Sequence, residues 1–393
     1  MMPKDFDVKY IGFYIFAFFL PLPLPLIVSA ILMGGIVINS FFLLKKKVRF
    51  DFFSIICILF FLTDLLSLTL SGREMEKNVI FNDTKLSFLI LPFLLFNIKE
   101  HLSGIKKQVT LFFILGTIVY ILYAWLYLIF YVSFWANIEI DQFSLMNVLK
   151  KEMPGSYHHT YIGSYIVFSG LMLLLNLIYK KGKTKWVLIG LYFFLFTSLI
   201  YIGSKLSILL MIIFSFWIII FSKGLTQKTF YSIIGSLTLC GILLYTIRDF
   251  LIYRLIGQSF DHRLIYFKES LNIIKQNFLF GIGDESINEV FFKIGENYVR
   301  LIPHNMYLKE LLSNGIIGFV ILIILFFFLV YTSVKLKNKE RLLLCFLVMS
   351  YGMIEDYIYL QRGVFFFLFF SLLFSSNKDV WSNLSFKSSE LKK

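Results

Sequence analysis

Residues 316–334 read IIGFVILIILFFFLVYTSV, a run of 19 residues without one charged side chain. A helix of about 20 apolar residues crosses the roughly 30 Å hydrocarbon core of a bilayer, where its backbone finds hydrogen-bond partners only within itself. The run ends at a basic cluster of Lys335, Lys337, Lys339 and Arg341. This stretch therefore predicts a membrane-spanning helix followed by a basic loop.

Similar apolar runs recur along the whole chain. Of its 393 residues, 58% are hydrophobic and only 16% are charged, whereas about a quarter of the residues in soluble domains are charged. We predict an all-α polytopic transmembrane bundle of about 12 spans, with one large periplasmic loop that contains short helices. Pro21, Pro23 and Pro25 should end or kink the helix between the first two spans. The predicted spans are 11–22, 24–44, 52–70, 86–98, 109–131, 162–179, 186–203, 206–222, 230–247, 316–334, 342–355 and 363–375.

Basic residues are concentrated in alternate loops, which predicts the orientation of the bundle. With the N-terminus inside, the cytoplasmic loops contain 23 of the 38 Lys and Arg but only seven of the 24 Asp and Glu. This bias follows the positive-inside rule, so we expect both termini to be cytoplasmic. We divide the chain into 1–247 (nine spans with short loops), 248–315 (a periplasmic loop carrying site residues) and 316–393 (three spans and a cytoplasmic tail). The net charge of +14 belongs to these loops and does not indicate nucleic-acid binding.

Other chemical motifs are few. Cys57, Cys240 and Cys345 each lie inside an apolar run, which indicates core residues and no disulfide framework. Gly281-x-Gly283 is too short to be a nucleotide fingerprint, so no cofactor is implied. Asp64 lies within a predicted span and should face the bundle interior, where it pairs with a hydroxyl or an arginine or lines a cavity.

Histidines near the predicted outer membrane edge are the candidates for acid–base chemistry. A neutral imidazole can accept a proton near pH 7. His304 is the first candidate, although its position also fits an interfacial histidine beside an ordinary amphipathic turn. His158 and His159 open a predicted span, and neighbouring positions point to different sides of a helix, which argues against a metal site there. His101 lies in a basic inner loop and is expected to be solvated.

Cationic residues form a second group on the predicted outer side. Lys205 lies between two apolar runs, and the outer segment contains Arg248, Arg254, Arg263 and Arg300. Snorkelling side chains or a solvated surface would explain them. The alternative is a positive outer cavity for phosphate, to which arginine offers bidentate donors.

Several of these residues belong to a set of motifs: Ser204-Lys205, Arg263, Gly281-x-Gly283, and His304-Asn305-x-Tyr307-Leu308 followed by Gly315 and Gly318. Together these motifs resemble the O-antigen ligase/polymerase superfamily. Members of this family are polytopic proteins with a large periplasmic loop, and they transfer or polymerise glycans carried on undecaprenyl pyrophosphate at the periplasmic face of the bacterial inner membrane. The resemblance covers roughly 155–330 in its motifs, and the hydropathy agrees over the whole chain. The family usually has arginine where this chain has Lys205.

The resemblance implies an inverting, metal-independent glycosyltransferase that uses no cofactor. His304 would act on the acceptor hydroxyl as general base. Lys205, Arg254 and Arg263 would bind the pyrophosphate. The expected partners are an undecaprenyl-pyrophosphate-linked oligosaccharide, a glycan or lipid A–core acceptor, and the lipid bilayer. The remaining expected substrate-binding residues are Asn305, Tyr307, His158 and His159.

Three functions stay open at this point. A polymerase would join repeat units of O-antigen or capsule, and we favour this function slightly. A ligase would move the finished glycan onto lipid A–core or onto protein, by the same chemistry with a different acceptor. A transporter or flippase of lipid-linked sugars would typically show internal repeats and broken helices near the membrane midplane, and neither is evident here.

Overall fold

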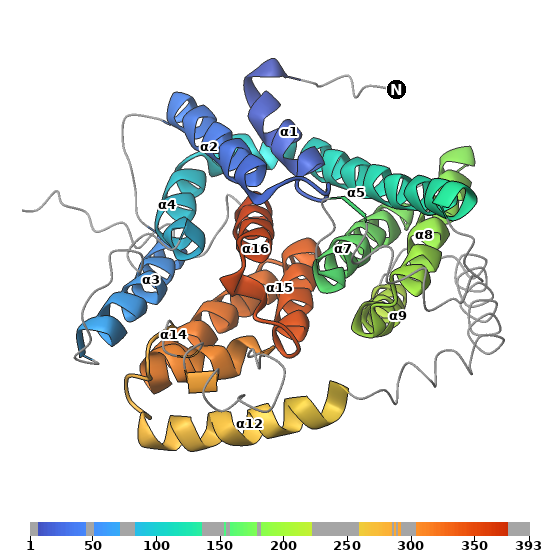
Figure 1. Ribbon diagram of the computed structural model, residues 1–393. Helices are drawn as coiled ribbons and strands as arrows, with labels where there is room; N and C mark the ends of the chain where they lie inside the picture. Colours follow the sequence, from blue (N-terminus) through green and yellow to red (C-terminus); the bar gives the residue numbers. More distant parts are fainter. Residues whose placement is uncertain are drawn as a thin grey trace, which may run out of the picture.

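The computed structural model describes residues 7–44, 51–70, 83–135, 153–154, 158–178, 182–221, 259–284, 287, 290–291 and 304–375. Within these ranges the regular secondary structure is entirely helical, which confirms the predicted all-α class (Figure 1). The helices are α1 (Ile11–Phe19), α2 (Leu26–Leu43), α3 (Phe52–Leu70), α4 (Asp83–Asn97), α5 (Lys99–Trp135), α7 (His159–Leu177), α8 (Lys183–Ile202), α9 (Lys205–Phe221), α12 (Ser259–Gln276), α14 (Met306–Lys335), α15 (Lys339–Gly352) and α16 (Gln361–Leu373), with short 3-10 turns at Val8–Tyr10 and Tyr357–Tyr359.

Four of the described helices are long and apolar enough to cross a membrane. They lie in α5, α7, α8 and α14, and six shorter apolar helices accompany them. The chain therefore has the helices of a membrane protein, while the count of about 12 spans stays a prediction. The span expected at 230–247 lies outside the described residues.

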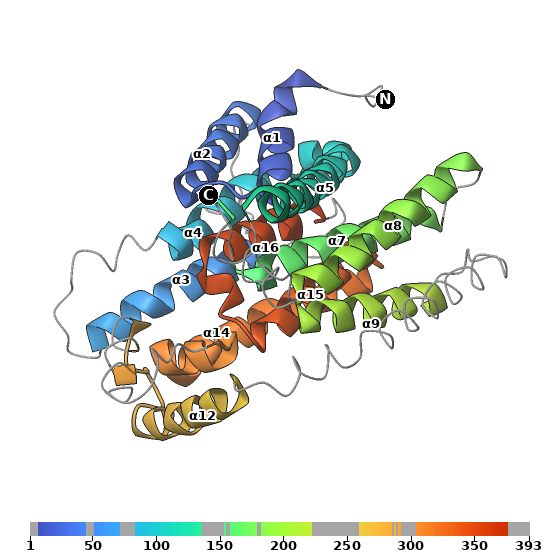
Figure 2. The ribbon, with the colours of Figure 1, turned by 45° about the vertical axis from the view of Figure 1, so that its right-hand side comes forward.

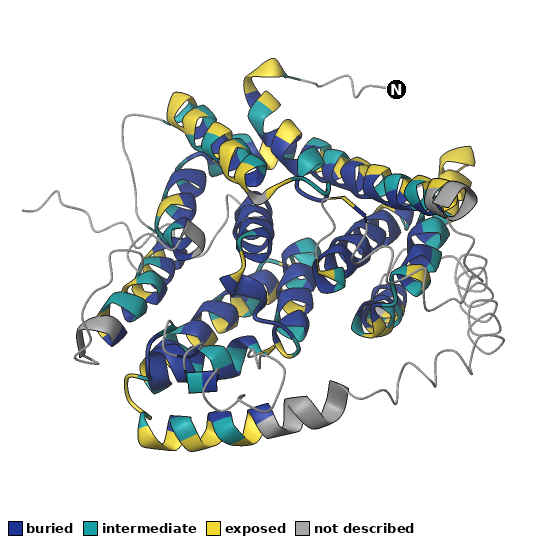
Figure 3. Ribbon diagram, in the orientation of Figure 1, coloured by how far each residue is buried: buried dark blue, intermediate teal, exposed yellow. Residues whose placement is uncertain are grey.

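The centre of the bundle is formed by α7 and α16, whose residues are almost all buried (Figure 3). In Figure 2, α7 runs beside α8 and α9, and contacts join all three. Aromatic rings fill much of the core: those of Phe113 and Phe370 have centroids 4.9 Å apart. Cys57 and Cys345 are buried in this core as predicted, and Cys240 lies outside the described residues.

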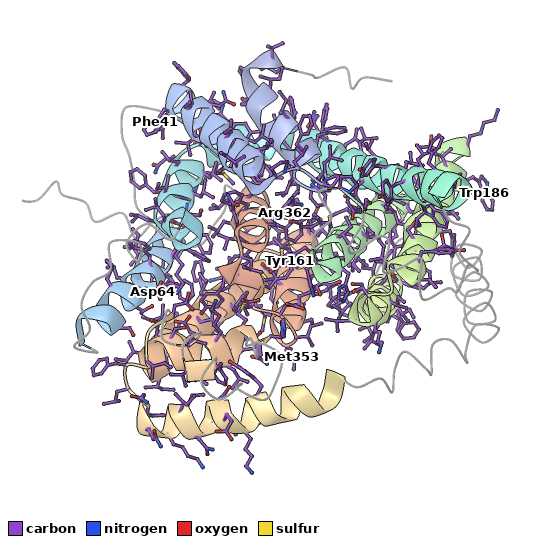
Figure 4. All side chains as sticks on the ribbon, in the orientation of Figure 1. Phe41, Asp64, Tyr161, Trp186, Met353 and Arg362 are labelled. Atoms are coloured by element: carbon purple, nitrogen blue, oxygen red, sulfur yellow. The ribbon has the colours of Figure 1, made fainter. Side chains whose placement is uncertain are left out.

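The outward sides of the peripheral helices remain apolar. Phe41 on α2 is 60% exposed and Trp186 on α8 is 66% exposed (Figure 4). Trp186 follows Lys183 and Lys185, so an aromatic ring and two lysines lie together at one end of α8. This composition is typical of the boundary between lipid and water.

Helix ends that the charge pattern assigns to the cytoplasmic side contact one another. The Tyr10 hydroxyl and the His101 Nδ1 atom are 2.9 Å apart, so His101 makes a specific contact as well as lying at the surface. The Lys106 Nζ atom lies 3.3 Å from the Glu340 carboxylate. The starts of α5 and α15 are thus at the same end of the bundle as the N-terminal segment.

The opposite end gathers the loops assigned to the outer side. The Ser207 and Tyr351 hydroxyls, on α9 and α15, are 2.6 Å apart. Arg362, at the start of α16, is buried and donates hydrogen bonds to the carbonyls of Leu22 and Leu24 (Figure 4). These carbonyls belong to the proline-containing turn between α1 and α2, where the helix break was predicted.

Asp64 faces the bundle interior, as its cost in lipid predicts (Figure 4). Its partners are an ion-paired Lys85 on α4 and Asn314 on α14, whose Nδ2 atom lies 2.6 Å from the carboxylate. The same amide lies 2.8 Å from the carboxylate of the fully buried Glu310. The expected hydroxyl or arginine partner is replaced by a lysine and an amide, which join α3, α4 and α14.

A kink at Gly315 divides α14 at the boundary that was predicted between the outer segment and the span at 316–334. Gly315 has φ 61° and ψ −158°, and α14 continues on both sides of it. A Cβ atom there would lie 2.3 Å from the Leu279 carbonyl oxygen, and one on Gly281 would lie 2.5 Å from the Leu312 carbonyl oxygen. Glycine is therefore required at both positions, because the Gly-x-Gly segment packs directly on the kink.

Candidate functional site

The block that begins at His304 forms the capped start of α14. The Asn305 side-chain oxygen accepts hydrogen bonds from the backbone amides of Tyr307 and Leu308 at 2.9 and 3.0 Å. This is an ordinary N-cap. The Asn305 amide also donates to the Met353 carbonyl at 2.9 Å, so the segment that carries His304 is fastened to the loop between α15 and α16.

That loop places a buried carboxylate between two of the predicted site histidines. The helix α15 ends at Gly352, earlier than the predicted span 342–355, so Glu355 belongs to the loop. Its side chain is 6% exposed; one oxygen lies 3.3 Å from His304 Nδ1 and the other 3.4 Å from His158 Nδ1. The Thr160 hydroxyl donates to the second oxygen at 3.3 Å. Two histidines that are distant in sequence thus share one carboxylate.

Burial acts to raise the pKa of Glu355, but the hydrogen bond from His304 and the neighbouring His158 and Thr160 outweigh it and hold the pKa below its ordinary value of 4.5. The carboxylate is therefore charged at neutral pH and acts as an acceptor. In neutral His304 this arrangement keeps the proton on Nδ1 and the lone pair on Nε2. The His304 side chain is 41% exposed, so the ring is accessible from outside the protein.

Lys205 lies at the same end of the bundle as this carboxylate. It is the first residue of α9 and is exposed. Two residues later, Ser207 bonds to Tyr351, which lies on the last turn of α15 shortly before Glu355. Lys205 therefore lies at the same end of the bundle as Glu355, and its role as an outer cation stays a prediction.

The helix that carries Arg263 packs against the start of α14. Tyr266 and Ile274 of α12 share a small apolar core with Leu308 and Leu312 of α14. Arg263 is thus on a helix next to the His304 segment, whereas Arg254 lies outside the described residues. His159 begins α7, and its ring centroid is 4.3 Å from that of His158.

Glu355 was not among the residues predicted from the sequence. The available signal was a pair of adjacent acidic residues, Glu355 and Asp356, at the boundary between the predicted span 342–355 and a short outer loop. Another cation of this region, Lys309, lies 3.3 Å from Asp284 and 3.6 Å from Asp356. Because Lys309 is neutralised by two carboxylates, we assign it to holding the outer segments together.

Two predicted substrate-binding residues, Asn305 and Tyr307, make hydrogen bonds within the protein that stabilise the fold. Asn305 caps α14, and the Tyr307 hydroxyl donates to the Met349 carbonyl at 3.1 Å. Both residues therefore help to fix the position of His304. No group of three His, Cys, Asp or Glu side chains among the described residues has an arrangement suited to a metal ion.

A cavity is found at the opposite end of the bundle, far from His304. It is bordered by Asp51 at the start of α3, Arg341 at the start of α15 and Ser375 after α16. These residues belong to the end where Lys106 and Glu340 pair. The cavity is therefore separate from the His304–Glu355–His158 group.

Comparison with known proteins gives a family match that covers part of the candidate site. Residues 190–323 match the family model described as O-antigen ligase. This region contains Lys205, Arg263 and His304, and it confirms the resemblance to the O-antigen ligase/polymerase superfamily. Glu355 and His158 lie outside the matched residues. No curated protein matches the chain.

Proposed function

We propose that this chain, which carries an O-antigen ligase-type region, is an inverting, metal-independent membrane glycosyltransferase of the bacterial inner membrane. Its donor would be an undecaprenyl-pyrophosphate-linked glycan at the periplasmic face, and its reaction would join repeat units of O-antigen or capsule. The observation that carries the proposal is the position of His304. Within the matched region, its Nδ1 atom lies 3.3 Å from the buried carboxylate of Glu355.

In the proposed reaction, His304 Nε2 takes the proton of an acceptor sugar hydroxyl as its oxygen attacks the anomeric carbon of the donor. A new carbon–oxygen bond forms while the bond from the anomeric carbon to the pyrophosphate oxygen breaks. Attack opposite the leaving group inverts the anomeric configuration. Glu355 keeps the imidazole in the required tautomer and stabilises the imidazolium that results.

Cations at the membrane edge would stabilise the departing undecaprenyl pyrophosphate. Lys205 and Arg263 are the candidates on described helices, and Arg254 is the third. Negative charge grows on the pyrophosphate as the bond breaks, so fixed cations there lower the energy of the transition state. The lipid tail of the donor remains in the bilayer while its charged head meets these residues at the surface.

The acceptor separates polymerase from ligase. Ligase activity, onto lipid A–core or protein, is supported by the description of the matching family model. A strain without this gene should carry single repeat units on its surface lipid if the protein is a polymerase, as we expect. A bare core with accumulated lipid-linked polymer would identify a ligase instead. Normal glycan in amount and length would contradict both functions. Gel analysis of surface glycan and of lipid-linked intermediates distinguishes the three results.

Substitution of Glu355 by glutamine should lower the rate of transfer by about 10- to 100-fold, because the amide no longer enforces the Nδ1–H tautomer of His304. The acid limb of the pH–rate profile should also move to lower pH, since loss of the carboxylate charge disfavours the imidazolium form. The pKa of Glu355 is itself below 4.5, so its own titration does not produce that limb. Rates of purified protein measured between about pH 5 and 8 provide the test.

The matched control is Glu340→Gln, which removes a carboxylate that pairs with Lys106 at the other end of the bundle. This variant should keep both the rate and the pH profile. A Glu355→Gln protein with reduced abundance and an unshifted profile would show that Glu355 has only a structural role.

A further inference from the structure

The helix α12 presents apolar side chains away from the protein. Phe267 and Leu271 on the helix, and Phe278 in the turn after its end, follow one another along one side and are 47%, 39% and 51% exposed. The side that packs on α14 carries Tyr266 and Ile274 instead. Leu279 and Phe280, just beyond the helix, are 57% and 37% exposed. We call these five exposed residues, Phe267, Leu271, Phe278, Leu279 and Phe280, the α12 apolar surface.

The end of this surface is held rigidly in its exposed position. The Phe278 carbonyl accepts a hydrogen bond from the Ile316 amide at 2.8 Å. The Phe280 carbonyl accepts one from the Ser67 hydroxyl at 2.8 Å. Close packing of Gly315 on the same segment leaves no room for it to shift. The backbone of this segment is therefore fixed by several contacts, and a contiguous exposed apolar surface of this kind marks an interaction site.

The α12 apolar surface continues into the lipid-facing sides of two membrane helices. Ile317 and Val320 on α14 are 39% and 45% exposed, directly after the residue that bonds to Phe278. Leu66 on α3 is 51% exposed, next to the Ser67 that bonds to Phe280. Lipid that covers these sides of α3 and α14 would therefore also contact the α12 apolar surface.

The polar residues of α12 are arranged as an interfacial helix requires. With 3.6 residues per turn, Lys268 and Lys275 lie immediately beside the row of Phe267, Leu271 and Phe278, and both lysines are exposed. Helices that rest in the membrane surface combine a buried apolar side with adjacent lysines that reach lipid phosphates. A protein partner would need no such border of lysines.

We propose that α12 lies in the surface of the membrane leaflet nearest the candidate site, with its apolar surface among the acyl chains and with Lys268 and Lys275 on lipid phosphates. Figure 1 shows α12 along one edge of the molecule beside α14, where no other described helix covers its outer side. The proposal does not depend on the transferase reaction. It assigns the bilayer itself as the partner of this helix.

Spin labels on single introduced cysteines in the full-length protein, held in nanodiscs, test the position of α12. The variants are Leu271→Cys and Phe278→Cys on the apolar surface, and Asn272→Cys and Gln276→Cys on the far side. Ile323→Cys, in the middle of α14, provides a lipid-facing reference. Wild-type protein, which contains Cys57, Cys240 and Cys345, measures background labelling. Relaxation by oxygen, which concentrates in lipid, is compared with relaxation by a water-soluble nickel complex.

Labels at positions 271 and 278 should resemble that at 323, with oxygen the stronger relaxant, while those at 272 and 276 should favour nickel. Nickel-favouring labels at 271 and 278 would overturn the proposal. Labels shielded from both reagents would also overturn it, because they would indicate a protein contact such as a second copy.

The lysine contacts are tested separately by lipid composition. In nanodiscs with phosphatidylglycerol, the label at position 271 should lie deeper than in nanodiscs of phosphatidylcholine alone. A Lys268→Gln/Lys275→Gln protein should lose this difference. If the label at position 271 lies at the same depth in both lipids when the lysines are intact, the lysines do not contact lipid phosphates.

Discussion

Substitution of His304 by alanine should reduce glycan transfer by about 10²–10⁴-fold, the usual contribution of a general base. The side chain is 41% exposed and precedes the N-cap of α14, so its removal leaves the packing of the bundle intact. The protein should therefore reach the membrane in normal amount. Surface glycan length and abundance in a strain that depends on the variant, together with immunoblots of the membrane fraction, measure both effects.

Two further variants make the result specific. His101→Ala removes a histidine at the opposite end of the bundle, where it contacts Tyr10, and should leave transfer unchanged. His304→Gln retains a hydrogen-bonding side chain but cannot accept a proton at neutral pH. No activity in this variant would favour proton transfer, and partial activity would indicate that His304 mainly orients the acceptor. Normal glycan from the alanine variant would show that His304 is an interfacial histidine without a catalytic role.

Loss of the Arg263 guanidinium should reduce transfer by about 10²–10³-fold, the effect of removing one donor that stabilises transition-state charge. Arg263→Lys should restore part of the activity, because an ammonium supplies charge without bidentate geometry. By the same reasoning, Lys205→Arg should be tolerated, since it introduces the residue usual in the family. Initial rates with a lipid-pyrophosphate-linked donor measure these differences.

The control for Arg263 is Lys337→Ala, which removes an exposed cation in the turn between α14 and α15, at the other end of the bundle. It should retain full activity. If Arg263→Ala protein is present in the membrane and transfers glycan at the wild-type rate, Arg263 does not bind the pyrophosphate.

Local sequence patterns predicted the helical class because membrane spans are continuous apolar segments. The break at Pro21–Pro25 and the inward position of Asp64 follow from single-residue chemistry, and the structure has both. A boundary between the outer segment and the span at 316–334 was predicted directly after Gly315, but the sharp kink there was not. The kink depends on a contact with Leu279, which hydropathy does not encode.

The candidate site was predicted only in part for a similar reason. His304 and His158 were both expected on the outer side, but nothing in their separate neighbourhoods indicates that they share a carboxylate. Glu355 was assigned to the end of a span because apolar residues precede it, whereas α15 ends at Gly352. The His304–Glu355–His158 group forms only when α7, α14 and the loop after α15 are packed together.

The arrangement on α12 illustrates a further limit of periodicity. The sequence indicates a stripe that includes Phe267, Leu271, Ile274 and Phe278, which by itself predicts a side packed on the protein. In the structure Ile274 is buried while the other three are exposed. Periodicity identifies an apolar side, but the material that covers it depends on the neighbouring helices and the membrane.

The central claim is most directly tested by transfer in a purified system. Wild-type protein in nanodiscs would receive a synthetic polyprenyl-pyrophosphate-linked repeat unit, and the products would be followed by mass spectrometry. We expect longer lipid-linked glycan together with released polyprenyl pyrophosphate, and neither product from His304→Ala protein prepared in the same way. Equal extension by wild-type and His304→Ala protein, or no release of polyprenyl pyrophosphate by the wild type with donor and acceptor present, would contradict the account.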